Sequence, residues 1–187
     1  MDLSADAVLT TWGAIMTNLF QQLARYNQWA NACLYSAALT MPEESYRWPA
    51  GVYFDSLRGT LNHLLLTDRL WLKRLTGEGD HPKELDTILY DDRRELARAR
   101  VAEDARLIAV VTAYDATSLT RPLVYATTSG ARQEQILSDV LMHLFNHQTH
   151  HRGHAHACCS IVGVAPPALD LLVYQRGFPA PDLAHLV

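Results

Sequence analysis

The fold of this chain is read most directly from Leu141-Met-His-Leu-Phe-Asn-His-Gln-Thr-His-His-Arg-Gly-His-Ala-His156, which holds six of the nine histidines. In an α-helix, where successive residues turn by about 100°, His143, His147 and His151 follow one another in i, i+4 steps along one side. The apolar residues that cluster near the direction of His151 are Val140, Leu144, Ala155, Cys158 and Val162. The pattern therefore predicts a helix on which His147 and His151 face the core.

Two buried imidazoles need partners. A pair at i, i+4 can hold one metal ion through neutral ring nitrogens, but two such histidines can also satisfy each other or nearby carbonyl groups. A third ligand from elsewhere in the chain distinguishes the two interpretations. His150 and His156 are expected to lie at a solvated surface.

Length and composition indicate one globular domain over residues 1–187. The chain is 49% hydrophobic and 19% charged, which is enough for a proper core without disulfides. A net charge of −4 and a pI near 6.1, with Lys and Arg scattered, argue against nucleic-acid binding. We therefore expect no nucleic-acid partner. We expect no membrane partner either, because no run of about 18 apolar residues occurs.

The cysteines and the N-terminus indicate a reducing, cytoplasmic location. Cys33, Cys158 and Cys159 are an odd number without a Cys-x2-Cys pair, so neither a disulfide framework nor a zinc ribbon is indicated. We expect all three to be small core residues. The first residues are acidic where a signal peptide would be basic.

Hydrophobic periodicity predicts four main helices, at about residues 11–40, 54–76, 91–114 and 134–161. An all-α four-helix bundle, antiparallel or crossover, follows, with a short hairpin or irregular excursion over 118–133 before the last long helix. A tail with a short helical or extended piece over 168–174 closes the domain. The third helix is expected to cover the bundle from outside and to expose its charged residues, which are Arg93, Arg94, Glu95, Arg98, Arg100, Glu103, Asp104 and Arg106.

The third metal ligand should be an inward-facing residue on another helix, since bundles build metal sites from facing helices. His63, at the polar edge of the second helix, is the first candidate. Asp68 is the rival, although a carboxylate in the middle of an apolar face could instead pair with a ring N–H or an arginine. His143 and His154 lie further from the apolar direction and are secondary candidates.

Three separated motifs, in order, resemble the DinB family. They are Tyr26-Asn-Gln-Trp-Ala-Asn31, Leu61-Asn-His-Leu-Leu-Leu-Thr-Asp-Arg-Leu-Trp-Leu72 and His143-Leu-Phe-Asn-His-Gln-Thr-His-His-Arg-Gly-His154. The closing Gly163-Val-Ala-Pro-Pro-Ala-Leu-Asp-Leu-Leu172 is also similar to the usual ending of that family. The resemblance spans nearly the whole chain.

The resemblance implies a DinB/YfiT-like bundle, often dimeric, in which a histidine triad holds a divalent metal ion. Carried over residue by residue, the three ligands are His63, His147 and His151. His154 stands where many relatives have glutamine, and it adds an extra ligand or a proton carrier. The family name refers to DNA damage, but the resemblance implies no DNA binding.

The main functional hypothesis is a metal-dependent enzyme with a zinc or nickel ion and a thiol-dependent transferase reaction. Some members of the family use mycothiol or bacillithiol, so the expected partner is a low-molecular-weight thiol or another small molecule. The alternatives are a metal-dependent hydrolase and a non-catalytic metal- or ligand-binding module in stress responses. A metal-free helical scaffold is a further alternative.

A homodimer is expected as well. The first helix carries more apolar surface than one face needs, because Trp12, Phe20 and Trp29 fall outside a single stripe.

Overall fold

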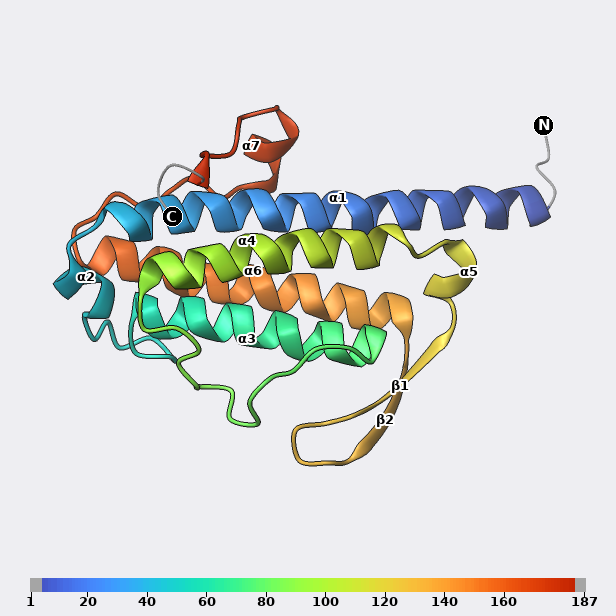
Figure 1. Ribbon diagram of the computed structural model, residues 1–187. Helices are drawn as coiled ribbons and strands as arrows, with labels where there is room; N and C mark the ends of the chain where they lie inside the picture. Colours follow the sequence, from blue (N-terminus) through green and yellow to red (C-terminus); the bar gives the residue numbers. More distant parts are fainter. Residues whose placement is uncertain (1–4, 184–187) are drawn as a thin grey trace.

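Four long helices form the body of the molecule in a computed structural model, which describes residues 5–183, with side chains from Thr11 onward. They are α1 (Ala5–Thr40), α3 (Leu57–Thr76), α4 (Arg93–Thr112) and α6 (Leu137–Ile161). α1 packs against α4 and α6, and α3 packs against the same two helices, so α1 and α3 lie on a diagonal (Figure 1). The all-α four-helix bundle predicted from the sequence is confirmed.

The helices run in an order that requires a crossover. α1 and α6 run in one direction and α3 and α4 run in the opposite one (Figure 1). Because α3 and α4 are parallel neighbours, the loop over 77–92 must return along the bundle before α4 begins. This long connection corresponds to the crossover alternative of the predicted bundle.

Short elements lie between the long helices and after the last of them. They are α2 (Glu43–Arg47), α5 (Ala116–Leu119), α7 (Leu171–Gln175), β1 (Pro122–Ala126) and β2 (Arg132–Ile136). The strands form an antiparallel hairpin with Pro122 opposite Ile136 and Ala126 opposite Arg132. The expected start of the last long helix at residue 134 was wrong by three residues, because β2 pairs with β1 up to that point.

Local signals in the sequence set the ends of α3 and the start of α4. The Ser56 side chain accepts a hydrogen bond from the Gly59 N–H, and Gly77 ends α3 with a φ of 79°. Asp92 accepts hydrogen bonds from the N–H groups of Arg94 and Glu95. Each side chain satisfies helix N–H groups that lack a partner within the helix, and glycine adopts a positive φ without steric cost. No helix within residues 5–183 has the length and apolar character needed to span a membrane.

The charged residues of α4 are only partly on its surface, which corrects the expected outer face. Arg100 is 1% exposed and pairs with two buried carboxylates. Its Nη1 lies 2.7 Å from Asp68 Oδ2, and its Nη2 lies 3.0 Å from Asp104 Oδ1. Glu103 is also buried, whereas Val101 on the same helix is 45% exposed. The charges turn inward because oppositely charged groups on α3 and α4 meet there.

Other polar residues join this ion pair into one buried network. Asn31 Nδ2 donates to Asp104 Oδ1 at 2.9 Å, and Arg152 donates to the Asn27 side-chain oxygen. Gln148 Nε2 donates to Asp68 Oδ1 at 2.5 Å and to the Leu64 carbonyl oxygen at 3.2 Å. The members come from α1, α3, α4 and α6, so the network connects all four helices. Asp68 therefore pairs with an arginine, which was one of the alternatives considered from the sequence.

Removing Arg100 should therefore destabilise the bundle severely. In Arg100→Ala the carboxylates of Asp68 and Asp104 lose their shared cation while they remain buried, which costs about 3–5 kcal/mol. Urea unfolding measures the loss. Arg98→Ala, on the exposed face of the same helix, is the matched control and should change stability by less than about 0.5 kcal/mol. Equal unfolding midpoints for the two variants would contradict this account of the network.

Candidate metal centre

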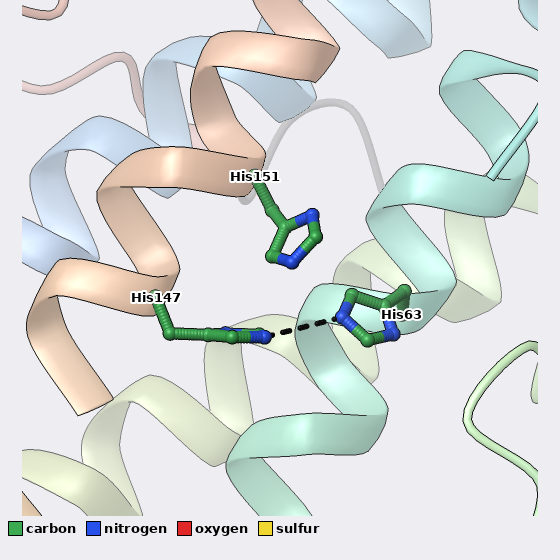
Figure 2. A group of neighbouring side chains, drawn as sticks. All are labelled: His63, His147 and His151. Carbon is green, nitrogen blue, oxygen red and sulfur yellow. Dashed lines mark hydrogen bonds between the residues drawn. The ribbon is translucent and has the colours of Figure 1, made fainter. Parts of the chain in front are cut away.

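Three histidines from two facing helices come together. His63 projects from α3, and His147 and His151 project from successive turns of α6, so that the three rings face a common point (Figure 2). His63 and His151 are buried, with 3% and 8% of their surfaces exposed, and His147 is half-buried. We call these residues the inner triad. The structure brings together the three ligands that the family resemblance implies.

The spacing of the triad suits a small divalent ion. Each residue has a ring nitrogen within 4.8 Å of a ring nitrogen of each other member. The Nε2 atoms of His63 and His147 are 3.3 Å apart (Figure 2). That separation is within hydrogen-bonding distance, and it is also about that of two nitrogens bound to one tetrahedral zinc ion at about 2.0–2.1 Å. The donor set, three imidazoles, suits zinc, nickel, copper and iron.

A backbone carbonyl sets the orientation of His63. Nδ1 of His63 lies 2.8 Å from the carbonyl oxygen of Leu85, in the crossover loop. Because a carbonyl only accepts, Nδ1 must carry the hydrogen, and in the neutral ring the lone pair is then on Nε2. The Leu85 contact thus presents Nε2 to His147, in the way that hydrogen bonds to the outer nitrogen orient metal-bound histidines.

Burial keeps the triad neutral. It lowers the pKa of His147 to about 3 and that of His151 to about 4, and the neighbouring histidines add to both effects. Burial also lowers the pKa of His63, although the hydrogen bond to Leu85 acts in the opposite direction. At neutral pH all three rings are therefore uncharged and can donate lone pairs without first releasing a proton.

An aromatic side chain covers the inner triad. The Phe54 ring stacks on His63 with centroids 3.7 Å apart, and its centroid lies 5.4 Å from that of His151. Gly59, in the first turn of α3, makes this possible, because a Cβ there would clash with the Phe54 carbonyl group. Phe54 therefore shields one side of the triad from water.

The triad opens into a cavity of about 650 Å³. The residues that line it are Tyr53, Phe54, His63, Leu85, Asp86, His147, His150, His151 and His154. Tyr53 and Phe54 come from the loop that precedes α3. Tyr46, on α2, is fully buried in the core. A volume of this size is in the range of small-molecule sites.

The other predicted site residues have different surroundings. Asp68 lies in the buried network with Arg100 and Gln148, where burial raises its pKa to about 6. His143 is exposed and packs its ring edge against Trp71, with centroids 5.3 Å apart. Only His154 lines the cavity.

Several groups that form the site were not predicted from the sequence. The Leu85 carbonyl and the Phe54 ring come from loops, where periodicity carries no information about position. His150, expected only to be solvated, is exposed but lines the cavity. Its spacing of four residues from His154 was a signal for this role, since i and i+4 share a helix face.

The cysteines are small core residues, as expected. Cys33, Cys158 and Cys159 are free and buried. Burial raises the pKa of Cys158 to about 11, and it raises the pKa values of the other two thiols as well. At neutral pH these thiols are protonated and poor nucleophiles.

A crossover four-helix bundle with a histidine cluster on two facing helices defines a class of small helical proteins able to hold a metal ion. The sequence model of the DinB family matches residues 16–181, so the chain belongs to the DinB family. Protein DinB of Bacillus subtilis (strain 168) is 26% identical over 167 residues, which cover 85% of this chain and 95% of the relative. Comparison with solved structures gave no significant match.

Substitution of the triad should remove tightly bound metal. His147→Ala and His151→Ala each leave two of the three candidate ligands, so metal-loaded protein should lose the ion during desalting. Metal content by mass spectrometry, per chain, is the measurement. His143→Ala removes an exposed histidine from the same helix and should retain the full ion content. Full metal content in both triad variants would show that the ligands lie elsewhere.

Proposed function

We propose that the chain is a metal-dependent enzyme of the thiol-dependent transferase type, with His63, His147 and His151 as ligands of a zinc or nickel ion. The observation that carries the proposal is the convergence of three neutral imidazoles on one point of an open cavity. Three protein ligands leave a position for a further group, which is typical of catalytic rather than structural sites. Membership of the DinB family supports the same assignment.

A divalent ion held there would supply Lewis acidity, lowering the pKa of a coordinated thiol or water. The residues of the chain prepare the site for this chemistry. The Leu85 carbonyl fixes the His63 ring, and the neutral triad adds no positive charge that would repel an ion. Phe54 and Tyr53 form an aromatic wall on one side of the cavity, and Phe54 stacks on His63 there.

The cavity also limits which residues act on a substrate. Asp68 is held by Arg100 and Gln148 and does not line the cavity, so its role is to position the helices. The buried cysteines are also absent from the cavity wall. The nucleophilic sulfur in this scheme therefore comes from a small-molecule thiol and not from the protein.

Cobalt substitution tests the thiol proposal. Addition of a mycothiol- or bacillithiol-type thiol to the Co²⁺-loaded protein should produce a sulfur-to-cobalt charge-transfer band, because a metal-bound thiol is the thiolate. His143→Ala should keep the band and His151→Ala should lose it. The alcohol analogue of each thiol is the ligand control and should give no such band.

If no thiol changes the cobalt spectrum while water still exchanges at the ion, the transferase proposal is wrong. The same open position would then activate water, and metal-assisted hydrolysis would be the better assignment.

We further propose that the chain forms a homodimer through α1. Phe20 and Trp29 pack within the chain, which corrects their expected role at an interface. Trp12, Ile15 and Leu19, however, are 61%, 50% and 43% exposed and follow one another in i, i+3, i+7 steps. An exposed apolar stripe of this kind is typical of an association surface.

Sedimentation at micromolar concentration should give a species of twice the 21.0 kDa chain mass. Trp12→Lys combined with Ile15→Lys should shift it to the monomer, because two charges would be buried in the interface. Trp48→Lys, at an aromatic residue that is 55% exposed elsewhere, is the control and should leave the dimer intact. A monomer in the unmodified protein would exclude an interface of ordinary strength.

A further inference from the structure

A second group of histidines lies beside the inner triad. His150, His151 and His154 each have a ring nitrogen within 4.8 Å of a ring nitrogen of both others. The ring centroids of His150 and His154 are 4.6 Å apart, and those of His150 and His151 are 4.8 Å apart. All three residues line the same cavity as the inner triad. We call them the outer group.

Polar atoms of the outer group lack partners. Nδ1 of His151, whose side chain is buried, has no hydrogen-bond partner among the described residues. The same holds for Nδ1 of His154 within that part of the chain. Buried polar groups are normally satisfied, so unpartnered ring nitrogens on a cavity wall indicate a ligand that binds there.

The charge and donor chemistry around the outer group select the ligand. The residues that line the cavity include Asp86 and no lysine or arginine among those described, so no fixed cation opposes a positive ion. A donor set of imidazoles favours zinc, nickel, cobalt and copper over magnesium or calcium, which prefer oxygen. Histidines at i and i+4 on a helix supply two ligands on one face.

We propose that His150, His151 and His154 form a second, outer site for a divalent transition-metal ion, which shares His151 with the inner triad. The outer site does not require the enzymatic function proposed above. A neutral imidazole has one lone-pair nitrogen, so His151 serves one ion at a time. The two sites therefore compete, and the outer site is the weaker one because the exposed His150 side chain must be ordered on binding.

The test isolates the outer site by removing the inner one. In a His63→Ala/His147→Ala protein, calorimetric titration with Ni²⁺ should show one ion per chain. Adding His150→Ala and His154→Ala should weaken Ni²⁺ binding at least tenfold. Adding His156→Ala instead, at a residue of the same helix outside both groups, should change the affinity less than twofold. If circular dichroism shows that the double background is unfolded, single His63→Ala replaces it.

Competition between the inner and outer sites is tested with protein in which the inner triad is unmodified. Zinc-loaded protein should bind Ni²⁺ at least tenfold more weakly than the His63→Ala/His147→Ala protein, because the zinc ion occupies His151. His154→Gln should keep one tightly bound zinc per chain, which tests the inner triad separately from the outer site.

Two outcomes would overturn the proposal. One is a folded background variant that binds no Ni²⁺ at millimolar concentration, or that binds it equally well without His150 and His154. The other is a zinc-loaded protein that takes up Ni²⁺ at undiminished affinity, which would show that the sites do not share His151.

Discussion

The structure depends on the buried ion pairs of Arg100 with Asp68 and Asp104. Placing an arginine inside a bundle is costly unless its charge is balanced and its donors are directed at acceptors. The buried charges are the guanidinium groups of Arg100 and Arg152 and the carboxylates of Asp68, Asp104 and Glu103. Glu103 also pairs with Arg106 at 3.0 Å, so the buried charges are nearly balanced. The helices can satisfy these groups together only in one relative arrangement, which gives the bundle a defined register beyond what leucine packing supplies.

This register determines where the histidines lie. Gln148 and Arg152 are the residues next to His147 and His151, and they point into the network while the histidines point into the cavity. Gln148 also donates to the carbonyl group of Leu64, the neighbour of His63 on α3. The buried network and the histidine cluster thus use different faces of α6, and both also contact α3. A rotation of α6 would therefore disrupt both.

The sequence predicted the parts of this arrangement that depend on helical periodicity. The four helices and the inward direction of His147 and His151 follow from spacing within one helix. His63 was the first candidate for the third ligand from its place on the second helix, but Asp68 stayed a rival until the family resemblance was applied, because spacing does not determine how two helices are paired. The inward turn of Arg100 and the contact of Leu85 with His63 were not predictable, since both depend on partners distant in the sequence.

The parallel course of α3 and α4 has an evolutionary consequence. A loop that must travel the length of a bundle is free to change in sequence and length, provided that its two ends stay in place. Here that same loop supplies Leu85 and Asp86 to the cavity. Related chains can therefore alter the shape and charge of one wall, and with it the molecules that the cavity admits, without disturbing the helices that hold the histidines.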